Sequence, residues 1–151
     1  MARLAIAVKR AYDPVSRGDG RRFLVERLWP RGISKAKLRV AAWLKEVAPS
    51  TELRQWFSHD PAKWDEFRKR YRRELDARPE AWQPILSAAR RGPVTLVYSS
   101  HDTEHNNAIA LQEYLRAKTR PFSDSSQSGR RTTSTRARRS ARALRRRSIP
   151  V

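Results

Sequence analysis

Three short segments of the chain have the apolar pattern of buried β-strands. Apolar and small side chains alternate over residues 4–8, residues 23–28 form an apolar run with a polar interruption, and residues 94–98 are apolar and rich in β-branched side chains. A loop rich in Pro, Gly, Ser and Asp separates the first two segments. The sequence therefore predicts three strands of a sheet that is covered on both faces.

Between the second and third strands the apolar spacing changes to that of helices. Four apolar residues at i, i+3, i+4 and i+7 predict one helix over residues 34–47, with Ser34 as its N-cap. Ser50 is expected to cap a short helix, and Asp60 followed by Pro61 is expected to begin a longer one. The longer helix carries an apolar stripe made of Trp64, Phe67, Tyr71 and Leu75.

Two further helices are predicted, one on each side of the third strand. The first contains Trp82 and Ile85, with Pro84 near its start or at a kink. The second runs from about Thr103 to Lys118 and would bury its apolar side against the sheet. Strands that alternate with helices are typical of the α/β class.

We therefore predict a small three-layer α/β domain over residues 1–118, with a short, mostly parallel sheet flanked by helices. The length of 151 residues suits one such domain. Residues 119–151 are rich in Arg, Ser and Thr and poor in apolar side chains. Such a segment buries too little apolar surface to offset its loss of conformational entropy, so we predict a disordered basic C-terminal tail.

The chain is strongly basic, with a formal net charge of +19, of which the predicted tail contributes +9 from ten Arg and one Asp. Charge of this size favours non-specific contact with nucleic acid. No apolar run is long enough to span a membrane and no secretory signal is recognisable, so a cytoplasmic protein without membrane contact is predicted. The absence of Cys excludes disulfides, thiol catalysis and thiolate metal sites.

The segment from Leu24 to Gly32, L-V-E-R-L-W-P-R-G, resembles the V-D-R-L-W-P-R-G signature of the YeaO-like proteins, which belong to the domain-of-unknown-function 488 group. Other segments match the family in the same order: Trp43-Leu44, Ala48 to Arg54, Trp64 to Leu75, Thr95 to Tyr98, and Asn106-Asn107-Ala108. The resemblance covers residues 3 to about 117 and leaves the tail outside. It implies a three-layer α/β domain with a mostly parallel sheet, in a family whose biochemistry is unassigned.

The resemblance also implies where a pocket would lie. More distant members of the group carry a D-V-R element on the matching strand. A later strand leads into a cluster of an acidic residue, Cys and His-Arg. By analogy, these two strand ends would form one pocket. Glu26 departs from the pattern, because the family signature has Asp at this position.

The residues themselves point to the same two strand ends. Two predicted strands end in polar, turn-rich segments, residues 27–32 and residues 99–107, and ligands of open α/β sheets bind beyond the carboxyl ends of the strands. The second segment also leads into a helix N-terminus, which favours an anion. We predict a pocket for a small anionic, nucleotide-like ligand there. The predicted ligand-binding residues are Arg27, Trp29, Arg31, Ser99, Asn106 and Asn107.

Several residues of these two segments also have a structural interpretation. Arg27 would brace the sheet if it paired with a nearby carboxylate, and Trp29 would be part of the core. The carboxylates available to Arg27 are Glu26, Glu52 and Glu74. Asp102 is a candidate N-cap for the last helix. Asn106 and Asn107 are poor helix formers in a first turn, which favours bonds to a ligand or to the neighbouring loop.

Asp102, Glu104 and His59 are the candidate catalytic groups, because carboxylates and imidazoles perform acid–base chemistry. His101 and His105 lie four residues apart, but the Glu between them has the wrong offset for the H-E-x-x-H zinc motif. No metal site is therefore predicted. No Gly-rich phosphate loop or nucleophile elbow occurs either, and no cofactor is predicted.

The leading hypothesis is a cytoplasmic α/β protein with an anion pocket at the strand ends. If it is an enzyme, a hydrolase or transferase acting on a nucleotide-like substrate is the most compatible class, by fold analogy. The alternative is a non-catalytic nucleic-acid-binding or regulatory accessory protein, and a third is a protein–protein adaptor. The nucleic-acid hypothesis would use Arg and aromatic side chains interleaved on one helix, although their spacing favours a core role for the rings. These residues are Trp64, Arg68, Tyr71 and Arg72.

Overall fold

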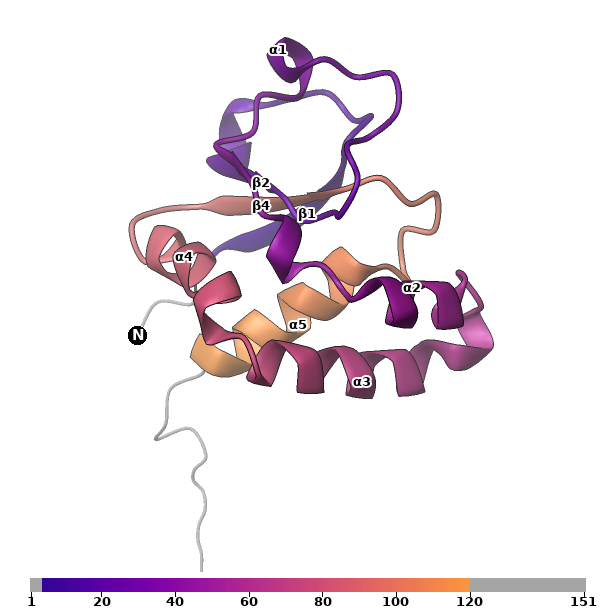
Figure 1. The fold of residues 1–151 in the computed structure, drawn as a ribbon. Coiled ribbons are helices and arrows are strands. Elements are labelled where there is room, and N and C mark those ends of the chain that lie inside the picture. Colours follow the sequence, from indigo (N-terminus) through magenta and orange to yellow (C-terminus); the bar gives the residue numbers. More distant parts are fainter. Residues whose placement is uncertain (1–3, 120–151) are drawn as a thin grey trace, which may run out of the picture. The chain divides into compact units, whose positions relative to one another are not determined.

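Four parallel strands form the sheet of the computed structural model, which describes residues 4–119 (Figure 1). The strands are β1 (Ile6–Arg10), β2 (Arg21–Leu24), β3 (Ala42–Trp43) and β4 (Val94–Tyr98), and their order in the sheet is β1-β4-β2-β3. All three pairings are parallel. The α/β class and the parallel sheet are thus confirmed. The predicted tail lies outside the described residues, apart from Thr119 at the end of the last helix.

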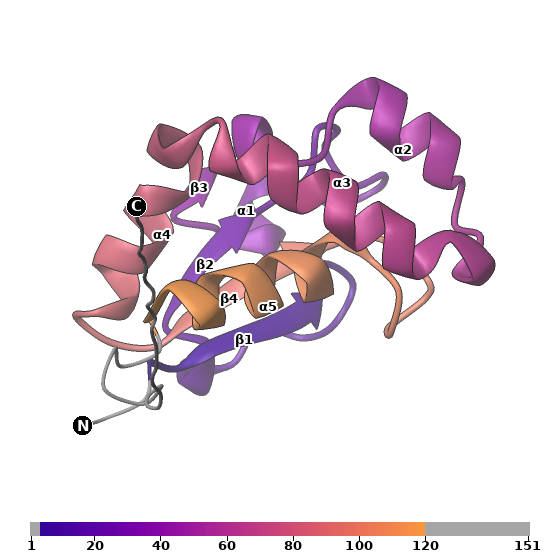
Figure 2. The ribbon, with the colours of Figure 1, turned by 90° about the horizontal axis from the view of Figure 1, so that it is seen from below.

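Helices cover the two faces of the sheet unequally. The helices are α1 (Lys35–Leu38), α2 (Thr51–Phe57), α3 (Trp64–Asp76), α4 (Pro79–Ala89) and α5 (Asn107–Thr119). Figures 1 and 2 show α2 to α5 on one face, whereas the short α1 and the neighbouring loops lie on the other. Three short 3-10 turns complete the pattern, at Arg17–Asp19, Lys45–Val47 and Pro61–Lys63. None of the helices in residues 4–119 is long and apolar enough to cross a membrane.

Each face of the sheet has its own apolar core. The larger core joins the sheet to α2–α5, and it contains the predicted stripe of α3: Phe67, Tyr71 and Leu75 are each at most 3% exposed. The smaller core, on the α1 face, contains Leu24 and Val97 together with Leu38 from α1. The polar tip of Tyr71 is satisfied inside the larger core, where its hydroxyl donates to the carbonyl of Val47 (2.6 Å).

The helix predicted over residues 34–47 is wrong beyond its first turn. Ser34 does cap a helix, since its hydroxyl accepts the N–H of Lys37 (3.2 Å), but α1 ends at Leu38 and Arg39 takes a left-handed conformation (φ 52°). Residues 42–43 then form the edge strand β3, which adds backbone hydrogen bonds to β2. Pairing with a distant strand decides the structure here, and the helical spacing of the apolar residues is coincidental.

Two element boundaries also differ from the prediction. β2 begins at Arg21 and ends at Leu24, earlier than the predicted 23–28, although the N–H of Val25 still bonds to the carbonyl of Val97 (3.1 Å). The last helix begins at Asn107 and not at residue 103. The cap predicted at Ser50 is confirmed by its bond to the N–H of Leu53. Asp60 bonds to the N–H of Ala62, but it caps the 3-10 turn Pro61–Lys63 that leads into α3 and not α3 itself.

A buried carboxylate fastens the loop between β1 and β2. Asp19 is 7% exposed and accepts bonds from Lys9 (3.0 Å), from Arg22 (2.8 Å) and from Ser16. The next residue, Gly20, has a positive φ of 61°, and a Cβ atom built on it would lie 2.1 Å from the carbonyl oxygen of Pro93. Only glycine therefore fits this close approach of the loop to the start of β4.

The outer edge of β1 is bonded by side chains from α5. The carbonyl of Ile6 accepts Nε2 of Gln112 (2.8 Å) and a guanidinium nitrogen of Arg116 (3.3 Å). These bonds occupy a backbone acceptor that the edge strand would otherwise present to solvent.

Candidate functional site

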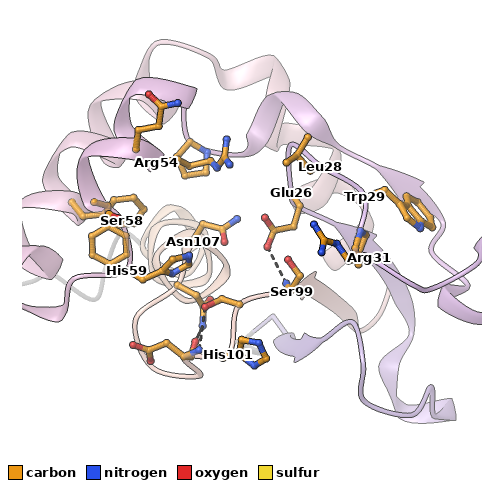
Figure 3. Close-up of a pocket in the computed structure, with 18 of the residues that line it drawn as sticks. Glu26, Leu28, Trp29, Arg31, Arg54, Ser58, His59, Ser99, His101 and Asn107 are labelled. Atoms are coloured by element: carbon orange, nitrogen blue, oxygen red, sulfur yellow. Dashed lines mark hydrogen bonds between the residues drawn. The ribbon is translucent and has the colours of Figure 1, made fainter.

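A cavity of about 760 Å³ lies at the carboxyl ends of β1, β2 and β4 (Figure 3). The segments that follow these strands form one side, and residues from α2, α3 and the start of α5 form the other. This is the position that parallel α/β sheets favour for ligands. Five of the six residues predicted to bind a ligand line this cavity, namely Trp29, Arg31, Ser99, Asn106 and Asn107.

Glu26 lies just beyond β2 and points into the cavity (Figure 3). Its carboxylate accepts the backbone N–H of Ser99 (3.0 Å), and its carbonyl accepts Nε1 of Trp43 (2.6 Å). Burial raises the pKa of the Glu26 carboxyl above its ordinary value, because it disfavours the charged form, while bonds from Ser99 and the charge of Arg54 oppose the rise. The cavity therefore holds a carboxylate whose position is fixed by a hydrogen bond from Ser99.

Two arginines bring positive charge to the same cavity. Arg31 belongs to the turn after β2, where its carbonyl accepts the hydroxyl of Tyr12 (3.0 Å), and Arg54 belongs to α2. Within residues 4–119, neither guanidinium forms a hydrogen bond or a close ion pair with another side chain or with the backbone. Each has five N–H donors in a planar fork, so both are available to an anion.

Arg27, the sixth predicted ligand-binding residue, does not line the cavity. Its guanidinium donates to the carbonyls of Pro49 (3.1 Å) and Ala48 (3.5 Å) and lies 3.7 Å from a carboxylate oxygen of Glu46. It therefore ties the end of β2 to the segment before α2. This is the bracing role, although the carboxylate partner is none of those considered from the sequence. Glu74 instead accepts the N–H and the hydroxyl of Ser50.

Trp29 combines a cavity position with a packing role. Its Nε1 donates to the carbonyl of Ile33 (2.6 Å), and its ring meets Trp43 edge-on with centroids 5.3 Å apart. The indole also packs against the smaller core. Because its polar atom is bonded internally, Trp29 offers a ligand only ring surface.

The loop between β4 and α5 is held by its own side chains. Asp102 accepts the N–H groups of Glu104 and His105 (both 2.9 Å), which lowers the pKa of its carboxyl, and it also contacts the His105 ring (3.1 Å). Asp102 thus closes a turn before the helix, and the prediction that it caps the helix is wrong. The cap is Asn106, whose Oδ1 accepts the N–H of Ile109 (2.9 Å). Asn107 donates to the carbonyl of Val25 (2.6 Å) and joins this loop to β2.

Two of the three candidate catalytic residues line the cavity, and the third does not. His59 lines the cavity, and both it and Ser58 have a positive φ (56° and 47°), which is costly for residues with a Cβ atom. Asp102 lines the cavity as well, while Glu104 is exposed and does not. His101, on the lining, lies 3.5 Å from a guanidinium nitrogen of Arg10. The described residues contain no group of three or more His, Cys, Asp or Glu able to hold a metal.

Two charged residues of the cavity, Glu26 and Arg54, were not predicted from the sequence as site residues. Side chains of an extended segment alternate between faces, so Glu26 and its neighbour Arg27 are not expected to point into one pocket. That alternation was the available signal for Glu26. Arg54 comes from a helix that contacts α3, and no local pattern places it near the strand ends.

Comparisons with known proteins agree with the sequence motifs. A family model described as "Inactive DUF488-N3 subclade" matches residues 5–134. The chain belongs to the DUF488 family. The range matched by the family model extends beyond residue 117, where the motifs recognised in the sequence end.

The relatives include YeaO of Escherichia coli K12, which is 42% identical over 112 residues, 74% of this chain and 97% of YeaO. Mb3100c of Mycobacterium bovis and Rv3073c of Mycobacterium tuberculosis are each 38% identical over 113 residues, 75% of this chain and 95% of the relative. All three relatives are uncharacterised proteins. No solved structure matches the chain. The YeaO-like, DUF488 membership implied by the sequence is thus confirmed.

Proposed function

We propose that this protein binds a small anionic, nucleotide-like ligand in the cavity at the strand ends and does not transform it chemically. The observation that carries the proposal is the pair Arg31 and Arg54, two guanidinium groups on the lining with no close partner in the described part of the chain. The N-terminus of α5 lines the same cavity and adds partial positive charge. The volume of about 760 Å³ is within the range of ligand sites.

Binding without catalysis is supported by the state of the candidate catalytic groups. Asp102 is committed to its turn, and its lowered pKa keeps it charged and unsuited to donate a proton. His59 has no hydrogen-bonding group in the described residues that would orient its ring. Serine nucleophiles need an adjacent base, and Ser100 instead accepts the N–H of Asp102 (3.1 Å). The description of the matching subclade as inactive points the same way.

The nucleic-acid alternative receives less support. Its stacking surface would require the rings of α3, but Tyr71 is 1% exposed and Trp64 packs against the larger core. The strongly basic segment 119–151 still favours non-specific electrostatic contact with polyanions. Experiments on the pocket therefore have to separate the two kinds of binding.

The test is calorimetric titration of the full-length protein with a nucleoside monophosphate and with pyrophosphate, at low and at high salt. Binding to the pocket should persist at about 200 mM salt, where polyanion contact through the tail weakens steeply. Arg31→Ala and Arg54→Ala should each weaken binding about tenfold or more, since each removes a charge-assisted contact. Arg91→Ala serves as the control, because Arg91 is exposed in the turn before β4, at the end of the strands opposite the cavity.

Two results would contradict the proposal. One is the absence of binding to every anion in the set by a folded protein. The other is equal loss of binding in the Arg31, Arg54 and Arg91 variants, which would mean that affinity reflects net charge and not the cavity.

A further inference from the structure

Glu26 is an unexpected residue in a pocket for an anion, because its carboxylate has the same sign of charge as the ligand. Among residues 4–119 its carboxylate forms no ion pair, although the charge of Arg54 acts on it and lowers its pKa. A bare phosphate group placed in this cavity would be repelled by it. The ligand must therefore present something other than its anion to Glu26.

The position of Glu26 is well defined, which makes it suited to recognition. The backbone is fixed by the bond from the Trp43 indole, and the carboxylate is fixed by the N–H of Ser99. An ionised carboxylate accepts about four hydrogen bonds and donates none. Contacts with Ser99 use only part of that capacity, so acceptor sites remain on the side of the cavity.

We infer that Glu26 selects a ligand that carries paired N–H donors, and that a guanine-type nucleotide is the class that fits. The inference rests on the proposed function, since Arg31 and Arg54 would hold the phosphate. Guanine presents a ring N–H beside an exocyclic amine, which matches the two oxygens of a carboxylate. Adenine places its amine beside a ring acceptor, and uracil places its N–H between two carbonyls, so both would set acceptors against Glu26.

The rest of the lining suits a planar base. Rings of Tyr12 and His59 contribute to the walls, and aromatic faces stack on bases. Leu28 lies on the same lining and is 68% exposed, an unusual exposure for a large apolar side chain. Contact with a bound base would cover it.

The experiment uses three nucleotides that differ at C2 of the base, and the C2 carbonyl of XMP also brings a hydrogen onto N3. GMP has an amine at C2, IMP has hydrogen there, and XMP has a carbonyl oxygen, while the sugar and phosphate are identical. Each is titrated at about 200 mM salt into the full-length wild-type protein and into Glu26→Gln, with Glu80→Gln on α4 as the matched control. The Gln side chain still accepts the Ser99 N–H, so Glu26→Gln should remain folded, which its unfolding temperature checks.

The expected order of affinity is GMP, then IMP, then XMP, with GMP at least about tenfold tighter than XMP, because one charge-assisted bond is lost and an acceptor faces the carboxylate. Glu26→Gln should reduce that ratio to about threefold or less, and Glu80→Gln should preserve it. Arg31→Ala should weaken all three nucleotides by the same factor.

Equal affinity of the wild-type protein for the three nucleotides would overturn the base assignment, as would a GMP preference that survives in Glu26→Gln. In both cases nucleotide binding that is sensitive to Arg31 would leave the proposed function standing. A protein that binds none of the three nucleotides, nor pyrophosphate, would overturn both.

Discussion

The buried ion pairs of Asp19 allow the most quantitative prediction, for the substitution Asp19→Asn. The carboxylate accepts bonds from Lys9, Arg22 and Ser16, and the Arg22 side chain is only 2% exposed. Asparagine keeps the size of the side chain but removes the charge. It leaves Arg22 buried without a counter-charge, and one of the guanidinium nitrogens of Arg22 already has no hydrogen-bond partner in the described residues.

The magnitude follows from the pKa of Asp19. Burial raises this pKa, but bonds from Ser16, Lys9 and Arg22 outweigh burial and lower it from 3.8 to about 2. By linkage, that difference corresponds to about 2 kcal/mol of the free energy of unfolding at neutral pH. Removing one partner of a buried pair typically costs about 3–5 kcal/mol, because the remaining charge is uncompensated. We therefore expect Asp19→Asn to lower the free energy of unfolding by about 3 kcal/mol at pH 7.

Urea unfolding of the wild type, Asp19→Asn and the control Asp65→Asn measures this cost at pH 7 and then between pH 5 and pH 2. Asp65 lies on α3 with its side chain 84% exposed, so its variant should change stability by less than about 1 kcal/mol. The folded-state pKa of Asp19 is depressed, so its contribution is complete above the unfolded-state value and is lost as the pH falls from 3.8 toward about 2.

Asp19→Asn should lack this part of the acid transition, and its stability should converge toward that of the wild type as the pH approaches 2. A loss below about 0.5 kcal/mol at pH 7 would refute the assignment of Asp19 as a stabilising charge. An acid transition that is unchanged in Asp19→Asn would refute the pKa argument separately.

Three further predictions concern the close contacts, the helix cap and the buried carboxylate. Gly20→Ala should lower the urea midpoint by an amount equivalent to about 2 kcal/mol or more, because the new Cβ would collide with Pro93 at a positive φ; an unchanged midpoint would contradict the close approach. Asn106→Ala should cost about 1 kcal/mol through loss of the bond to the N–H of Ile109, and faster amide exchange in the first turn of α5 should accompany it. Glu26→Gln should leave the unfolding temperature at pH 7 equal or raised. The folded-state pKa of Glu26 is raised, so its ionised carboxylate destabilises the fold once the pH exceeds the unfolded-state pKa of 4.5. A clear decrease in the unfolding temperature would show that the charge is stabilising.

The parts of the fold that were predictable are those whose signal is local. β4 is a β-branched apolar run that is buried at every position, and the stripe of α3 follows from spacing alone. Ser34, Ser50 and Asp60 were found because an N-cap depends on residues within one turn.

The errors occurred where distant contacts decide. Val40 and Trp43 fit a helical face with Leu44 and Val47, yet the first two pack on the α1 face of the sheet and the last two on the other. The same limit applies to the cavity. The strand-end rule located Arg31, Ser99 and the start of α5, but it could not tell which neighbour in an extended pair faces inward. It therefore selected Arg27, whose guanidinium braces the segment before α2, in place of Glu26.

The two edges of the sheet bear on how this protein behaves at high concentration. Exposed strand edges are templates for pairing with another copy of the chain, and that pairing begins aggregation. β3 offers only two residues to an incoming strand, and β1 carries Lys9 and Arg10 and has its Ile6 carbonyl occupied by Gln112 and Arg116. An incoming strand would have to displace two α5 side chains. The sheet is thereby protected against edge-to-edge association, even though it is built from a short parallel array with no barrel closure.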